Sequence, residues 1–322
     1  MTAMRPVPVV AACLGLVPFL AGCVVHVDSG GFTARKEQRF EVTGRPTVDL
    51  DTFDGAIEVQ AWNKSEVLVV VETRASSKAL LEGIDIETEH EGSRVALKVT
   101  APDKGAWSFE TGGVSRSAKV IATVPIDSEV RLRSGDGSVR VERVRGVIDA
   151  RTSDGRIVMR DVSGDIVADS GDGSVQMEDV DGRCTVSTRD GSVLVSGRLR
   201  GGLKATTGDG SVTIRAAEGS EVSDDWQIET TDGGVVLALP DQLDARLDAR
   251  TNDGRISLNG FPDLVIEREG EGRVLQAVLG KGERVLRIRT GDGSITLKRV
   301  HVPMPPAPPA PPAPPAPPVT EP

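Results

Sequence analysis

The residues with the clearest chemical potential are acidic, because an Asp-Gly pair recurs along the chain at nearly constant spacing. In residues 134–216 the pairs are Asp136-Gly137, Asp154-Gly155, Asp172-Gly173, Asp190-Gly191 and Asp209-Gly210. Carboxylates held at a fixed spacing suggest a calcium ladder, since calcium prefers oxygen ligands. The alternative is turn chemistry, because Gly accepts positive φ and Asp bonds to backbone groups in turns. The Gly-Gly-x-Gly-x-Asp motif of calcium-binding β-rolls is absent, which favours turns.

Paired carboxylates also hydrolyse glycosidic bonds, for which they need a separation of about 5–10 Å. Asp149, Asp165 and Asp169 are candidates for such a pair. In a stacked repeat, however, outward acids on neighbouring coils reach this separation without any catalytic role. The sequence contains no His/Cys cluster at metal-ligand spacing, no phosphate loop and no nucleophile elbow. We therefore expect a non-catalytic protein without catalytic residues, metal or cofactor, and a polysaccharide-acting enzyme is the less favoured alternative.

The few aromatic residues bear on both the core and the surface. Aromatics make up 3% of the chain, which predicts a thin interior filled by aliphatic side chains. Trp62, Trp107 and Trp226 are the only tryptophans. Trp107 suggests either an exposed platform for sugar or protein or a residue that covers the end of the fold. Burial is favoured, because large apolar side chains are usually buried.

The spacing of the Asp-Gly pairs predicts the elements that carry them. Apolar residues follow three and five positions after each Asp: Val139 and Val141, Ile157 and Met159, Val175 and Met177, Val193 and Val195, Val212 and Ile214. This alternation predicts a short strand, and a second strand follows a Gly in each repeat. One unit of about 18 residues cannot bury its inner face alone, so we expect units stacked about 4.8 Å apart. The predicted fold is all-β, a single parallel β-solenoid (β-helix) with right-handed crossovers.

The array continues beyond residue 216 with longer intervals. Asp-Gly recurs at Asp232, Asp253 and Asp292, and the interval before Asp292 predicts one coil with an atypical turn near residues 270–282. Glu142, Arg160 and Glu178 occupy the same outward position in successive units. Parallel stacking would place these opposite charges side by side.

The two ends of the chain predict an anchored protein with an extended tail. Residues 1–22 resemble a lipoprotein signal peptide, because Leu20-Ala21-Gly22-Cys23 follows a short apolar stretch. Cys23 would then be lipidated, and Val24 after it favours the outer membrane; an ordinary secretory signal is the alternative. We predict a tether at 23–37, the solenoid at 38–300 and a Pro-rich tail at 301–322. The tail favours polyproline II, either as a passive stalk or as a ligand for the cell wall or a Pro-binding partner.

The remaining cysteines need no special chemistry. Cys13 lies in the signal peptide, and Cys184 takes the inward position that Ile148 and Ile166 hold in neighbouring repeats. Cys184 is therefore predicted to be a small core residue. No disulfide is expected in the mature chain.

One stretch carries a family resemblance. Val124-Pro125, Val130, Leu132, Gly137 and Val139 precede repeated Ser/Thr-x-Asp-Gly-x-Ile/Val. This order resembles the bacterial putative-adhesin family, domain of unknown function 4097 with its head-GIN relatives, over about residues 38–300. The resemblance implies a β-helix in the cell envelope and brings no catalytic residues.

Charge and resemblance together define the expected function. The net charge of −10 argues against nucleic-acid binding. We expect a lipid-anchored protein of the outer membrane, periplasm or cell surface with an adhesin-like binding or scaffold role. Its partners would be the membrane through Cys23 and an envelope protein or surface polymer. An envelope-stress or regulatory accessory protein is the alternative.

Overall fold

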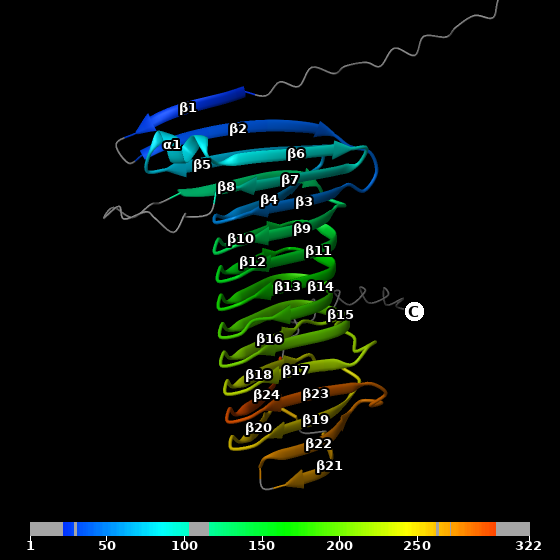
Figure 1. The fold of residues 1–322 in the computed structure, drawn as a ribbon. Helices are drawn as coiled ribbons and strands as arrows, with labels where there is room; N and C mark the ends of the chain where they lie inside the picture. The colour runs from blue at the N-terminus through cyan, green and yellow to red at the C-terminus, as the bar shows by residue number, and fades with distance from the viewer. Residues whose placement is uncertain (1–21, 29–30, 103–115, 262–263, 271, 301–322) are drawn as a thin grey trace, which may run out of the picture.

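The computed structural model describes residues 22–28, 31–102, 116–261, 264–270 and 272–300. These residues form one tall stack of β coils with one short helix, α1 (Lys78–Glu82), near the end that we call upper (Figure 1). The prediction of an all-β protein is confirmed. No helix in these ranges is long and apolar enough to cross a membrane.

Each regular coil contains one strand that leads into an Asp-Gly turn and one that follows it. The strands of the first kind build what we call the long-strand face: from the upper end, β7 (Arg94–Thr100), β3 (Thr47–Thr52), β9 (Glu129–Ser134), β11 (Arg145–Thr152), β13 (Ser163–Ser170), the second halves of β14 (Val175–Ser187) and β15 (Val193–Thr207), β17 (Trp226–Thr230), β23 (Val285–Thr290) and β19 (Ala245–Thr251). The short-strand face contains β8 (Arg116–Pro125), β4 (Ile57–Trp62), β10 (Val139–Glu142), β12 (Ile157–Arg160), the first halves of β14 and β15, β16 (Val212–Ala216), β18 (Val235–Leu239), β24 (Ile295–Arg299) and β20 (Ile256–Asn259).

Strands of successive regular coils pair in parallel at the register set by the sequence period. Val139 pairs with Ile157, which pairs with Val175. The two inward rows predicted from the alternation are buried, with exposures of 0–1% at these positions. A third buried row, Val144 and Val162, closes the corner between the end of the short strand and the start of the next long strand. The core is thus a narrow column that runs the length of the stack.

Antiparallel strands close the upper end. On one side β1 (Gly22–Asp28), β2 (Gly31–Glu41), β5 (Glu66–Ala75) and β8 pair in that order, and on the other side β6 (Asp85–Glu91) pairs with β7. The predicted tether at 23–37 is thus wrong as a structural description, because the described part of this segment is strand. Pairing with β5 satisfies the backbone of β2, so a segment with many polar side chains still joins the sheet. The predicted signal peptide, apart from Gly22, and the Pro-rich tail lie outside the described residues.

The lower end is built out of sequence order. β17 and β18 do not pair with the next coil in the chain, β19 and β20; instead β23 and β24 lie between the two coils in parallel register. Figure 1 shows orange β23 between yellow β17 and β19. The hairpin of β21 (Val265–Gly270) and β22 (Val274–Leu279) pairs antiparallel with β19. The prediction of one coil with an atypical turn before Asp292 is therefore wrong.

The sheet is mixed, so the expectation of a single parallel solenoid does not hold for the whole chain. The upper end, like the lower one, is stacked out of sequence order. The coil of β3 and β4 lies between the coil of β7 and β8 and the coil of β9 and β10. A terminal coil exposes the open end of the apolar column and must be covered. Antiparallel hairpins allow this with short connections, whereas parallel strands require a full crossover.

Candidate functional site

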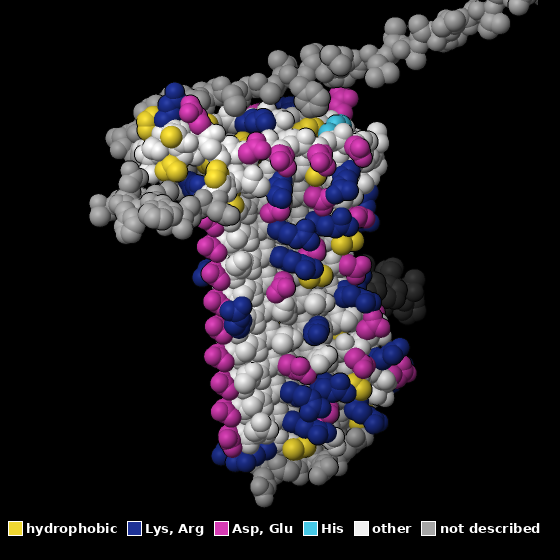
Figure 2. Space-filling model, viewed as in Figure 1, with side chains coloured by type: hydrophobic (Ala, Val, Ile, Leu, Met, Phe, Trp, Pro, Cys, Tyr) yellow, Lys and Arg dark blue, Asp and Glu magenta, His cyan; other side chains and the backbone are white. Residues whose placement is uncertain are grey.

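The Asp-Gly turns stack along one edge of the molecule. Figure 2 shows a straight line of acidic side chains down this edge. In spatial order the turns belong to Asp54, Asp136, Asp154, Asp172, Asp190, Asp209, Asp232, Asp292 and Asp253. All are exposed except Asp54, which is half-buried. We call this line the aspartate column.

A ladder of buried hydroxyls, rather than the carboxylates, holds these turns together. Thr152 Oγ1 accepts a hydrogen bond from the Gly155 N–H at 3.1 Å and donates to the carbonyl oxygens of Gly135 and Gly137 in the coil above, at 2.8 and 3.0 Å. Equivalent bonds to the Asp-Gly glycine of the neighbouring coil come from Ser134, Ser170, Thr188, Thr207, Thr230, Thr290 and Thr251. The sequence-based expectation that Asp would bond the backbone in these turns is thus wrong, because the Ser or Thr two residues earlier does so.

The glycine of each Asp-Gly pair is required because the backbones of stacked turns approach closely, and not because of its own backbone conformation. A Cβ on Gly155 would lie 2.0 Å from the carbonyl oxygen of Gly137, and one on Gly137 would lie 1.7 Å from that of Gly55. Neither Gly137 nor Gly155 has a positive φ. The expected reason, tolerance of positive φ, therefore does not apply at these two positions.

The aspartate column does not form a cage for a cation. Within the described ranges, no three His, Cys, Asp or Glu residues are close enough together to hold a metal ion. Calcium needs six or more oxygens around one point, whereas this column offers about one carboxylate per 4.8 Å. The close stacking of the turns, bonded through the Ser and Thr hydroxyls, is thus the better account of the repeated Asp-Gly.

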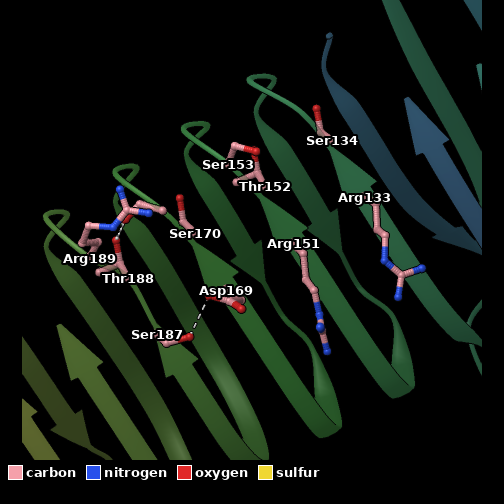
Figure 3. A pocket seen from close by; sticks show the side chains of 11 residues that line it. Arg133, Ser134, Arg151, Thr152, Ser153, Asp169, Ser170, Ser187, Thr188 and Arg189 are labelled. Carbon is pink, nitrogen blue, oxygen red and sulfur yellow. Dashed lines mark hydrogen bonds between the residues drawn. The ribbon is translucent and has the colours of Figure 1, made fainter. Parts of the chain in front are cut away.

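A groove of about 540 Å³ lies on the long-strand face, beside the hydroxyl ladder. Its floor is one row of register partners on successive strands, Arg133 on β9, Arg151 on β11, Asp169 on β13 and Ser187 on β14. Figure 3 shows the two arginines on neighbouring strands, with Asp169 and Ser187 continuing the row. We call this line of residues the outer row, and this part of it the upper groove.

Neighbours within the upper groove fix most of its charges. Arg151 makes two hydrogen bonds to Asp149, at 2.8 and 3.2 Å, and this contact raises the pKa of Arg151. Ser187 donates to Asp169 Oδ1 at 2.8 Å. Within the described part of the chain, the guanidinium of Arg133 has neither a hydrogen bond nor an ion pair. Arg133 is therefore the free cation of the groove.

The acids considered for glycoside hydrolysis do not form a catalytic pair. Asp149 lies beside Val167 and Asp169 lies beside Arg151 in the parallel register, so Arg151 adjoins both carboxylates. Asp165 lies near the start of β13, with Arg183 at 3.8 Å. Each acid therefore has a cationic or hydroxyl neighbour rather than a second carboxylate.

The outer row continues down the stack to a second groove of about 590 Å³. From Ser187 the row passes through Thr206 and Glu229 to Arg289 and Arg250. Arg250 and Arg289 share Asp248, at 2.9 and 3.8 Å. In Figure 2 basic side chains gather in two groups on this face, one in each half. The lower groove thus repeats the adjacent arginine pair of the upper one.

The tryptophans correct one expectation about the core. Trp226 is fully buried at the inward position that Leu203 holds in the coil above, and its indole N–H donates to the Gly201 carbonyl at 2.9 Å. The interior is therefore not restricted to aliphatic side chains. Trp62 is half-buried at the corner of the upper coils. Trp107 lies outside the described residues.

Two of the cysteines lie in the described part of the chain. Cys184 is buried with no disulfide, as predicted, and burial raises the pKa of its thiol to about 12. Cys23 lies in β1 at the outermost edge of the upper end, paired with Lys36 along the backbone. The predicted row of opposite charges, Glu142, Arg160 and Glu178, forms only in part. Arg160 contacts Glu178 at 3.0 Å, whereas Glu142 contacts Arg140 of its own strand at 3.8 Å.

The fold and the grooves define a stacked β-coil protein that presents long exposed faces. The chain belongs to the Toastrack DUF4097 family, whose model matches residues 47–298. Among solved structures, it is similar to a putative lipid binding protein from Parabacteroides distasonis, with 14% identity over 82% of this chain and 96% of that chain and a TM-score of 0.45. It is also similar to putative adhesins from Parabacteroides distasonis and Bacteroides fragilis, each with 11% identity, which cover 82% and 83% of this chain and 96% and 97% of their own, with TM-scores of 0.36 and 0.33. No curated protein matches the chain.

Proposed function

We propose that this protein is a lipid-anchored, non-catalytic binding protein of the cell envelope whose outer row holds an extended acidic polymer. The polymer would lie along the stack axis and contact the upper and lower grooves together. Linear glycans that carry carboxylate groups have the required chemistry, because a planar guanidinium binds a carboxylate through two parallel hydrogen bonds.

The observation that carries this proposal is the direct register pairing of Arg133 with Arg151. Like charges on neighbouring strands destabilise a sheet, by about 0.2–1 kcal/mol in this setting. Asp149 bonds directly to Arg151, whereas Arg133 makes no hydrogen bond or ion pair among the described residues, although Asp51 is its register neighbour on β3. A bound anion in the groove would remove the repulsion. Arg289 and Arg250 are also register partners, and they share the single carboxylate of Asp248.

The spacing of the two grooves favours a polymer over a small ligand. Arg151 and Arg289 are separated by five register steps, through Asp169, Ser187, Thr206 and Glu229. At about 4.8 Å per step this is about 24 Å. Hydroxyl and carboxylate groups line the interval and can hydrogen-bond to sugar hydroxyls. Two weak sites on one chain give a strong combined affinity when a single ligand reaches both.

The proposed anchor would orient the stack on its membrane. β1, which contains Cys23, is the outermost strand of the upper end. A lipid on Cys23 would hold this end at the membrane, and several acyl chains together give stable attachment. The grooves would then lie on the side of a pillar that stands away from the surface.

The proposal is tested with polygalacturonate, an acidic glycan, and dextran, a neutral one, by affinity electrophoresis. We expect retardation by polygalacturonate alone. Arg133→Ala or Arg289→Ala should each weaken binding by roughly tenfold, the value of a hydrogen bond to a charged group. Arg215→Ala, on the opposite face, is the matched control and should bind normally. Equal retardation of all three variants would contradict the assignment of the outer row.

The same experiment separates the alternatives. Shortening of polygalacturonate during incubation would indicate a polysaccharide-acting enzyme. If neither glycan binds and crosslinking in cells captures one envelope protein, the regulatory or accessory role is favoured.

A further inference from the structure

A third groove, of about 360 Å³, lies at the corner opposite the aspartate column, where short strands end and the next long strands begin. We call it the corner groove; its lining includes Trp62, Ile126, Arg143, Val144, Arg145 and Asp161. Ile126 is 37% exposed, and among the described residues only one other large hydrophobic side chain is as open. The outer row does not include any of these residues.

The tryptophan of this groove is held in a fixed orientation. The indole N–H of Trp62 donates to the Glu66 carbonyl at 2.8 Å. The ammonium of Lys64 lies 4.4 Å from the ring centroid. An indole fixed in this way beside an exposed isoleucine forms a rigid apolar surface that can bind a ligand with little loss of side-chain entropy.

The described chain ends, just before the Pro-rich segment, at the same corner. Leu297 on β24 is connected to Val59 on β4 by a continuous line of register partners, Leu237, Ile214, Val195, Met177, Met159 and Val141. Three residues after Leu297 the chain reaches Val300, and three residues after Val59 it reaches Trp62. Val300 is still bonded to the stack, through its N–H to the Leu239 carbonyl at 2.8 Å. The described part of the chain therefore ends, at Val300, directly below the corner groove, measured along the stack axis.

The length of the segment matches this distance. Seven register steps separate Leu297 from Val59, or about 34 Å at about 4.8 Å per step. Polyproline II advances about 3.1 Å per residue, so about 11 residues cover the distance. Residues 301–322 exceed this need. The Pro-Ala-Pro-Pro repeats near residues 308–315 would meet Trp62.

The chemistry of the groove suits this occupant. Polyproline II segments bind grooves lined by aromatic side chains, on which proline rings pack. Their backbone carbonyls have no internal partners and need donors from the receptor. The exposed guanidinium of Arg143 can provide such donors. Residues 302–320 carry no charge, so they bring no unpaired ion to the apolar part of the groove.

We propose that the Pro-rich segment, residues 301–322, folds back along this corner and docks in the corner groove of the same chain. Docking covers Ile126 and the edge of Trp62. It also fixes the segment beside the upper coils instead of leaving it as a free stalk.

The test uses a spin label on the segment and the indole N–H signals of the tryptophans. The chain carries Cys13→Ser, Cys23→Ser and Ala313→Cys; Cys184 stays unlabelled because it is buried and its thiol remains protonated. We expect broadening and loss of the Trp62 indole signal, with the signal of buried Trp226 retained. Equal intensities of both signals with and without the label would overturn the proposal.

Two controls separate docking from tethering and from contacts between copies. In the first, a Gly-Ser segment of equal length replaces residues 303–322 and carries the label at the same position; the Trp62 signal should recover, and persistent broadening would overturn specific docking. In the second, spin-labelled and ¹⁵N-labelled copies are mixed; the Trp62 signal should remain, and its loss would show docking between two chains rather than within one. Trp62→Phe assigns the signal.

Discussion

The Thr152 hydroxyl donates a hydrogen bond to the carbonyl oxygen of Gly137, one coil above, at 3.0 Å. It also accepts a hydrogen bond from the N–H of Gly155 in its own turn. One side chain thus satisfies buried backbone groups of two successive coils. Repetition of this contact down the stack locks the register of each turn onto the next.

Thr152→Val should destabilise the protein by about 1–3 kcal/mol, because it leaves a buried N–H and a buried carbonyl group without this partner. The free energy of unfolding in urea measures the effect. Thr152→Ser is the matched control, since Ser134 and Ser170 hold the same position in neighbouring coils, and it should lose much less stability. Equal losses for Val and Ser would show that packing rather than the hydroxyl matters.

Gly155→Ala should be destabilising by about 1–3 kcal/mol or more, because the new Cβ would overlap the Gly137 carbonyl oxygen. The control is Gly234→Ala, where the nearest atom to the added Cβ would be 3.5 Å away. This change should alter stability by no more than about 1 kcal/mol. Thermal unfolding followed by circular dichroism compares the two. A neutral Gly155→Ala would contradict the close stacking of the turns.

Asp154→Asn should raise stability at low salt by about 0.2–1 kcal/mol, because it removes one of several like charges stacked on neighbouring strands. The gain should shrink as added salt screens the column. Unfolding in urea at two sodium chloride concentrations measures both effects. A calcium-dependent rise in the melting temperature that Asp154→Asn abolishes would show instead that the aspartate column binds calcium.

Cys184 makes stability depend on alkaline pH. Burial raises the pKa of the thiol from 9.0 to about 12, so the folded state keeps its proton where the unfolded state loses it. The contribution is complete below pH 9 and is lost as the pH rises from about 9 to 12. Relative to Cys184→Val, the wild-type chain should therefore lose about 2 kcal/mol by pH 10.5, since each pKa unit is worth about 1.36 kcal/mol. A difference that does not vary with pH would place the thiol in contact with water.

The sequence predicts the regular coils well because one signal repeats in each. The alternation after Asp136 and Asp154 identified inward residues such as Val139 and Met159, and all proved buried. The burial of Trp226 was missed because the alternation predicts an inward position but not the size of the side chain that fills it. The repeat of about 18 residues carries no information about the size of the inward side chain.

The ends and the candidate site could not be predicted for a different reason. The turns at Asp232, Asp253 and Asp292 have the same Thr-x-Asp-Gly chemistry, so any of them could stack on any other. The order in space depends on how the chain covers its open apolar end, which is not a local property. Likewise, Arg133 and Arg289 stand far apart in sequence and join one row only through that stacking.

The most direct test of the proposed function is the affinity of the protein for polygalacturonate fragments of increasing length. The account predicts weak binding of short fragments and a steep rise once a fragment reaches both grooves, about 24 Å apart. The rise should vanish when Arg133→Ala or Arg289→Ala removes one groove. Affinity that does not depend on length, or that survives both substitutions together, would contradict the proposal that the outer row holds one extended acidic chain.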